Sequence, residues 1–314
     1  PMIKVLLIQR VFSIPTDTLL IIFLKYSQEL RDFCGFRVVP DASKFTRFKQ
    51  DFLMDLQSMF DHLVDITEPI CQRIDSNLAS MSIFDTSGIE AWVTENNPKY
   101  ANRIIKQLKA FAKAHNFDKN FDPYKAAYGS MPAHATANPA IQQMYINGHF
   151  CYAYKFGIVT NGLGIVRDIT FYNKDFLNAH PNIIVEKKSD SPDEDKSLAD
   201  SKALLPVLID FFQKHPLINP KTFLGDAAFD TIEIYKTKRR VCRCENPCTT
   251  SSCGRMIYIY PEKNLRAYPG VERGSVEWDE TYKIRVNVEK SINHFKDSFC
   301  IAGRKTQNEK TLHA

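Results

Sequence analysis

Two alternating apolar segments joined by Asn161-Gly162 constrain this chain more than any other feature. The first, residues 150–160, places large apolar or aromatic side chains at every second position: Tyr152, Tyr154, Phe156 and Ile158. The second, residues 164–172, follows the Asn-Gly pair, which strongly favours a tight turn between two strands. We therefore predict a β-hairpin with one face on a core. With 314 residues and 44% hydrophobic content, the chain can bury such a core.

Two further short apolar segments each deliver an aspartate. Residues 81–84 lead into Asp85, and residues 222–225 lead into Asp226. We expect both segments to be buried strands with the acid at the carboxyl end, and residues 201–215 to form an amphipathic helix between them. This order predicts an α/β fold in which a mixed sheet is flanked by helices and the acids meet at one edge of the sheet.

Residues 1–78 are predicted to form a helical N-terminal domain. Residues 17–26 and 29–33 have helical apolar periodicity, and a longer helical region runs to about residue 73, with Ser43 as the expected N-cap. The second helix of this region carries Lys44, Arg47 and Lys49, so the helix pair could contact DNA or serve only for packing, and we favour packing. Because the chain begins at Pro1 rather than Met, we expect it to be a fragment.

A helical segment near the C-terminus carries four regularly spaced polar residues: Tyr282, Arg285, Glu289 and Lys296. On a continuous α-helix they would fall within roughly a 60° arc. A neighbouring apolar stripe could pack on the core, and it comprises Ile284, Val288, Ile292, Phe295 and Phe299. The simplest interpretation is an amphipathic helix with a solvated charged face. The alternative is an acid that holds a cation, between basic groups that hold phosphates.

Asp85, Asp226 and Glu289 are the candidate catalytic acids. Each could have an ordinary role, since Asp85 and Asp226 could cap a turn or a helix and Glu289 could pair with Arg285. If the fold brings the three together, they repel one another unless divalent cations neutralise them. Carboxylate oxygens favour Mg²⁺ or Mn²⁺, and two such ions about 4 Å apart can activate a water or a 3′-hydroxyl.

The spacing of Tyr282, Arg285, Glu289 and Lys296 resembles the Tyr-Arg-Glu-Lys motif of bacterial insertion-sequence DDE transposases. Asp85-Thr-Ser-Gly and Gly225-Asp226 are similar to the first and second acid motifs of that family. The segment from Leu30 to Phe48 also resembles the helical region that precedes the catalytic domain there. The resemblance covers roughly residues 27–314.

This resemblance implies a ribonuclease H-like catalytic domain over residues 79–314, with a cysteine-containing insertion at about 236–281. It implies metal-dependent cleavage of a phosphodiester at transposon ends, followed by strand transfer into target DNA. Asp85, Asp226 and Glu289 would hold two Mg²⁺ or Mn²⁺ ions, and Tyr282, Arg285 and Lys296 would bind DNA phosphates. The implied partner is double-stranded DNA, with a homodimer in the DNA complex and a bacterial, cytoplasmic, nucleoid-associated location.

Two alternative functions follow from departures from that family. The segment between Asp226 and Glu289 is short for members with an elaborated insertion, and the chain ends soon after Lys296. An inactive, truncated DNA-binding remnant is therefore one alternative, and a related metal-dependent nuclease without strand transfer is another.

Composition adds two expectations. The formal net charge of +5 permits nucleic-acid binding without requiring it. The apolar residues 5–24 are interrupted by polar ones, so no membrane span is expected.

Four cysteines lie close together in the sequence and could form a structural zinc site or remain free thiols, and we favour free thiols: Cys242, Cys244, Cys248 and Cys253. The isolated His134, His149 and His294 are expected to be structural rather than metal-binding.

Overall fold

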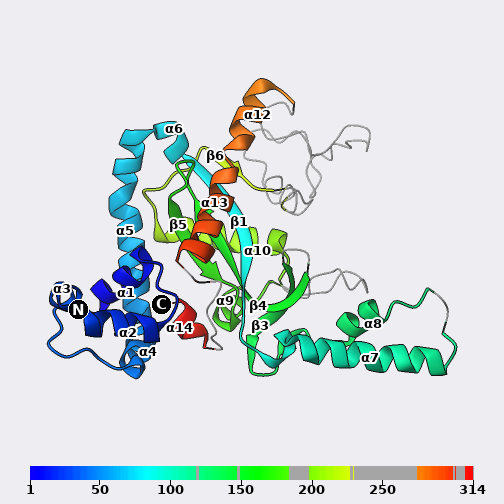
Figure 1. Ribbon diagram of the computed structural model, residues 1–314. Helices are drawn as coiled ribbons and strands as arrows, with labels where there is room; N and C mark the ends of the chain where they lie inside the picture. Colours follow the sequence, from blue (N-terminus) through cyan, green and yellow to red (C-terminus); the bar gives the residue numbers. More distant parts are fainter. Residues whose placement is uncertain are drawn as a thin grey trace.

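The computed structural model describes residues 1–117, 120–146, 149–183, 198–226, 229, 274–299, 301 and 308–313, except for the side chain of His149. Among these residues the chain forms an α/β fold with a six-stranded mixed sheet flanked by helices (Figure 1). No helix in the described part of the chain combines the length and the apolar character that crossing a membrane requires.

Four short helices open the chain and share one apolar cluster. They are α1 (Met2–Val11), α2 (Asp17–Tyr26), α3 (Gln28–Cys34) and α4 (Ala42–Asp51). The cluster includes Val5, Leu20, Leu24 and Phe45, all fully buried. The predicted helices over residues 17–26 and 29–33 are confirmed.

The N-cap expected at Ser43 is wrong. The carboxylate of Asp41 caps α4 instead, because it accepts a hydrogen bond from the Lys44 amide at 3.0 Å, and the hydroxyl of Ser43 donates to the same oxygen. On this helix Lys49 is buried and paired with Asp17 at 3.1 Å, which supports the packing role, whereas Lys44 and Arg47 are exposed.

The sheet is built around two long central strands, β1 (Met81–Glu90) and β4 (His149–Thr160), which pair antiparallel. β4 also pairs with β5 (Val166–Phe171) and with β3 (Asn138–Ile146), and β3 pairs with β2 (His134–Ala135). β6 (Thr222–Leu224) lies parallel to β1 on its other side. The predicted hairpin is therefore confirmed as β4 and β5, whereas β3 lies in a region where the sequence shows no strong period.

The turn of this hairpin differs from a two-residue Asn-Gly turn. It runs over residues 161–165, and the residue with a left-handed backbone is Gly164, with φ of 78°. The Asn161 side chain accepts hydrogen bonds from the amides of Leu163 and Ile165, and the Gly162 amide donates to the carbonyl of Leu78. A Cβ at position 162 would lie 2.8 Å from that carbonyl oxygen, so the close approach requires glycine.

Helices cover both faces of the sheet. One face carries Ile83, Tyr152, Phe156 and Ile158, and α13 (Val286–Asn293) packs on it through Val288 and Ile292. This confirms the predicted apolar stripe, and burial of each such side chain contributes about 1.5–3 kcal/mol. The opposite face, under Phe84 and Val159, is covered by α10 (Asp200–Lys214) and by α5 (Leu53–Ile74).

The remaining described elements are short or peripheral. They are α6 (Ser76–Ala79), the 3₁₀ turn Thr94–Asn96, α7 (Pro98–Ala114), α8 (Pro123–Ser130), α9 (Lys174–Ala179), α12 (Val276–Lys283), a π-helical turn at His294–Ser298 and α14 (Glu309–His313). α7 leads away from the sheet and projects from the body of the molecule, with α8 beside it (Figure 1).

Candidate active site

Asp85 lies in the middle of β1, not at its carboxyl end. The strand continues to Glu90 because residues 86–90 keep their pairing with β4, so the predicted strand end at Asp85 is wrong. Side chains alternate along a strand, so Asp85 shares the face of Ile83, which is the face that α13 covers.

The register of the two parallel strands brings Asp226 beside Asp85. Ile83 of β1 pairs with Leu224 of β6. Asp85 lies two residues after Ile83 within β1, and Asp226 lies two residues after Leu224, just beyond β6. Asp226 is thus close to the predicted strand end, but the predicted burial of this strand is wrong because Phe223 is 39% exposed. Both carboxylates are half-buried.

Glu289 comes from α13, above the same face. The helix is fixed by two hydrogen bonds to the turn between β4 and β5. The side-chain amide of Asn287 donates to the carbonyl of Gly162, and the Ser291 hydroxyl donates to the carbonyl of Gly164, both at 2.8 Å. The hairpin turn, predicted only as a chain reversal, thus also positions the helix that carries the third acid.

The carboxylates of Asp226 and Glu289 act electrostatically on Asp85. The pKa of Asp85 is raised to about 6, mainly by burial and also by these nearby carboxylates. The amide of Thr86, which donates to the Asp85 carboxylate at 2.8 Å, and the guanidinium of Arg285 oppose the shift. A half-buried carboxyl next to two others is the electrostatic setting in which a cation would be favoured.

Arg285 lies between the acids and an aromatic pair. Its guanidinium makes an ion pair with Glu289 at 2.6 Å and lies 5.4 Å from the ring centre of Tyr282, which in turn stacks on Trp278. Burial lowers the pKa of Arg285, yet Tyr282, Glu289 and Asp85 outweigh it and raise that pKa above its ordinary value. The expected pairing of Glu289 with Arg285 is therefore present, and it occurs beside Asp85.

Lys296 contacts β1, the strand that carries Asp85. Its ammonium donates a hydrogen bond to the hydroxyl of Ser87, two residues after Asp85 on β1. Burial lowers the pKa of Lys296, and Asp85 is among the acids that oppose this shift. Ser87 was not singled out from the sequence, although the two-residue period of a strand places it on the face of Asp85.

The segment from Tyr282 to Lys296 is not one continuous α-helix. α12 ends at Lys283, the amides of Ile284, Arg285, Asn287 and Val288 bond three residues back, and a π-helical turn follows α13. The β-branched and polar residues 284–288 favour helix weakly, which is consistent with this tightening. The continuous helix on which the roughly 60° arc depends is therefore not formed, and Lys296, in the π-helical turn after α13, contacts Ser87 of β1.

The metal arrangement itself is not formed in the described part of the chain. There, no three His, Cys, Asp or Glu side chains are grouped as ligands around one point. The donor set still suits hard cations, because the carboxylates of Asp226 and Glu289 lie near enough to the Asp85 carboxylate to raise its pKa. The cysteines 242, 244, 248 and 253 lie outside the described residues, while His134 and His294 are exposed.

The N-terminal helices match a known domain family. Residues 1–51 match a transposase domain family, DUF772. The match ends with the last residue of α4 and so covers the four helices that share one apolar cluster. It supports a transposase family for the chain. No curated protein and no solved structure gives a match.

Proposed function

We propose that this chain is a DDE transposase that cleaves phosphodiesters at transposon ends and transfers the freed strand into target DNA. The observation that carries the proposal is the electrostatic grouping of Asp85, Asp226 and Glu289 with Arg285 on one face of the sheet. The transposase domain match at residues 1–51 supports DNA as the substrate class. The mixed sheet, with β1 between antiparallel β4 and parallel β6, supports the ribonuclease H-like catalytic domain that this function needs.

In this proposal Asp85, Asp226 and Glu289 hold Mg²⁺ or Mn²⁺. When bound, such ions supply activation of a water or a 3′-hydroxyl and stabilisation of the leaving oxygen. The residues around them act on the DNA. Arg285 is positioned to exchange its ion pair with Glu289 for a DNA phosphate, since a guanidinium binds carboxylate and phosphate with the same paired donors. Tyr282 supports the guanidinium from its ring face.

Lys296 would hold a second phosphate near β1. Its hydrogen bond to Ser87 keeps the ammonium on the Asp85 face of the strand. Burial lowers the pKa of Lys296, so the protonated ammonium is destabilised in this position unless an anion binds beside it. Because two transposon ends must be processed together, we propose that two copies of the chain act on one pair of ends.

A cleavage and joining assay tests this function. The purified chain is incubated with Mg²⁺ or Mn²⁺, labelled duplexes carrying the segments that flank its coding region, and a supercoiled target plasmid. We expect nicked ends and joined products from the wild type, and at least a 100-fold loss in Asp85→Asn, Asp226→Asn and Glu289→Gln. Glu280→Gln, on the exposed side of α12, is the matched control and retains the wild-type rate.

The outcomes separate the alternatives. Binding of DNA with no product from any variant would indicate a non-catalytic DNA-binding remnant. Cleavage without joining would indicate a metal-dependent nuclease. Products that persist in all three acid variants would overturn the assignment of the acids.

A further inference from the structure

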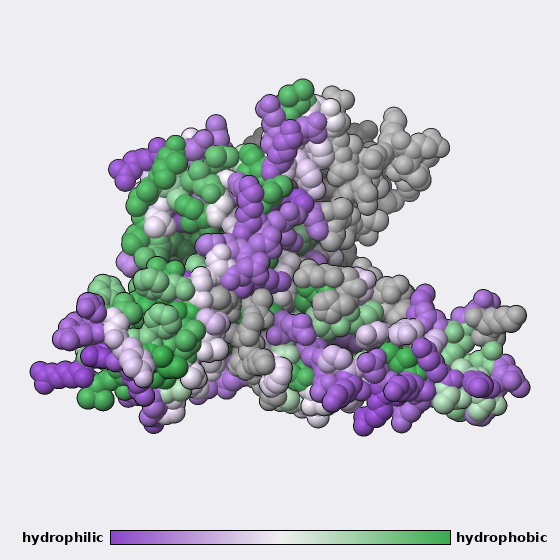
Figure 2. Space-filling view, in the orientation of Figure 1, coloured by the Kyte–Doolittle hydropathy of each residue, from purple (hydrophilic) through white to green (hydrophobic). Residues whose placement is uncertain are grey.

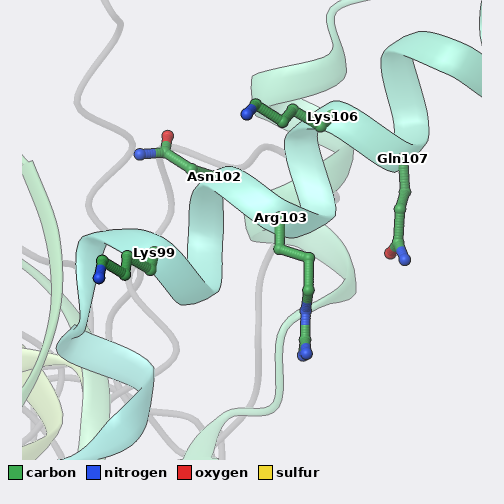
Figure 3. A pocket seen from close by; sticks show the side chains of 5 residues that line it. All are labelled: Lys99, Asn102, Arg103, Lys106 and Gln107. Carbon is green, nitrogen blue, oxygen red and sulfur yellow. The ribbon is translucent and has the colours of Figure 1, made fainter.

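Helix α7 carries a cationic face that the proposed active site does not use. Its exposed basic side chains are Lys99, Arg103, Lys106, Lys109 and Lys113, and its sequence contains no acidic residue. At 100° per residue all five fall within about a 120° arc. Figure 3 shows the first part of this face, where three of them line a surface hollow of about 440 Å³ together with Asn102 and Gln107.

The opposite face of α7 fixes the helix to the protein. Ile105 is buried, and Tyr100 and Ile104 pack against the core cluster beneath α13. The helix is therefore held by its apolar side, and its cationic side is turned to solvent along the projecting arm, where Figure 2 shows many hydrophilic residues beside some apolar ones.

In the described part of the chain these charges are not compensated by carboxylates. Among the described residues none of the five makes an ion pair; Arg103 and Lys109 instead lie over the rings of Tyr100 and Tyr124. Neighbouring cations are three or four residues apart, a spacing at which like charges repel and weaken a helix. An ordinary solvated helix face mixes both signs, so a single-sign stripe indicates an anionic partner.

The dimensions indicate a polyanion rather than a single phosphate. From Lys99 to Lys113 the stripe is roughly 21 Å long, over which duplex DNA carries about 12 phosphate charges. We propose that α7 is a second DNA-binding surface, which holds the phosphate backbone of a duplex away from the catalytic acids. The inference rests on the proposed function only in taking DNA as the polyanion.

A salt-dependence measurement on the full chain tests this proposal. The variant K99Q/R103Q/K106Q is compared with the control K25Q/R37Q/K174Q, which removes the same charge from exposed positions on other elements. Binding of a fluorescent 30-base-pair duplex is followed by anisotropy, without divalent cations, from low to moderate salt. Glutamine is a good helix former, so α7 should persist, and circular dichroism checks this.

We expect the α7 variant to bind about tenfold or more weakly and to lower the slope of log affinity against log salt by about 2–3, since each lost phosphate contact lowers it by about 0.9. The control should keep the wild-type slope. An α7 variant with unchanged slope, or a control that weakens binding equally, would overturn the proposal. So would loss of binding to phosphatidylglycerol vesicles without any loss of DNA binding.

This result is independent of catalysis. If the wild type neither cleaves nor joins DNA but the α7 variant still shows the reduced slope, the proposed reaction fails and the DNA-binding surface stands. If cleavage depends on the acids but the slope is unchanged, the reaction stands and the surface does not.

Discussion

At the scale of single residues, Asp85 combines a cost in stability with a proposed catalytic role. Its carboxyl is held next to Asp226 and Glu289, partly out of water, and its pKa is raised to about 6. A carboxylate whose charge is disfavoured in the folded state lowers stability, and such costs are characteristic of sites that await a ligand.

The first prediction is a pH-dependent gain of stability in Asp85→Asn without divalent cations. The folded pKa lies above the unfolded value of 3.8, so the folded state binds the proton more tightly, and wild-type stability rises as pH falls from about 6 to 4. The variant lacks this dependence. At pH 8 it should therefore be about 1–3 kcal/mol more stable than the wild type. Urea unfolding between pH 4 and 8 measures the difference, which should vanish near pH 4; a constant difference would exclude this cause.

A second prediction concerns Arg167 and Glu68, a buried ion pair at 3.1 Å that joins β5 to α5. Arg167 also donates to the carbonyl of Val64 and to the hydroxyl of Thr67. Arg167→Met leaves the Glu68 carboxylate buried without its cation and should cost about 3–5 kcal/mol in chemical unfolding. The double variant with Glu68→Leu should recover most of this loss. A single variant that unfolds like the wild type would show that the pair does not hold α5 to the sheet.

At the scale of elements, the sequence predicts those helices, strands and turns that are determined by local periodicity and turn residues. The hairpin, the helices over residues 17–26 and 201–215, and the apolar stripe of α13 all follow from alternation or helical spacing. The length of β1 could not be predicted, since residues 85–88 are polar or small and continue the strand only because β4 pairs with them. The breaks around α13 could not be predicted from the spacing of the four polar residues, because that spacing assumes a regular helix.

The third prediction concerns the attachment of α13 to the hairpin turn. The side chains of Asn287 and Ser291 bond to the carbonyls of Gly162 and Gly164, so the double variant to alanine should lose about 1–3 kcal/mol of stability, at about 0.5–1.5 kcal/mol for each bond. Because these bonds position Glu289, cleavage should fall more than this loss of folded protein explains, when measured at a temperature where the variant is folded. Asn293→Ala, at an exposed position on the same helix, is the control.

At the scale of the whole molecule, the candidate site draws on segments far apart in the sequence. The choice of the three acids rests on two predicted strand ends, on the spacing around Glu289 and on the family resemblance. Their electrostatic contact depends on the parallel pairing of β1 with β6 and on the packing of α13 across both β1 and β4. The sequence could name the acids by type and order. It could not supply the register that sets Asp85 beside Asp226, because that register is fixed by three paired residues more than a hundred positions apart.

The last prediction follows from this convergence. A cation that binds only the folded chain, where the acids are assembled, must stabilise the whole fold by mass action. We expect Mn²⁺ at about 100 times its dissociation constant to add about 2.7 kcal/mol, seen as a higher midpoint of thermal unfolding. The increase should be lost in Asp226→Asn and Glu289→Gln, retained in Glu280→Gln, and reduced below pH 6, where Asp85 gains a proton. An equal increase in every variant would place Mn²⁺ elsewhere on the chain and separate the three acids from metal binding.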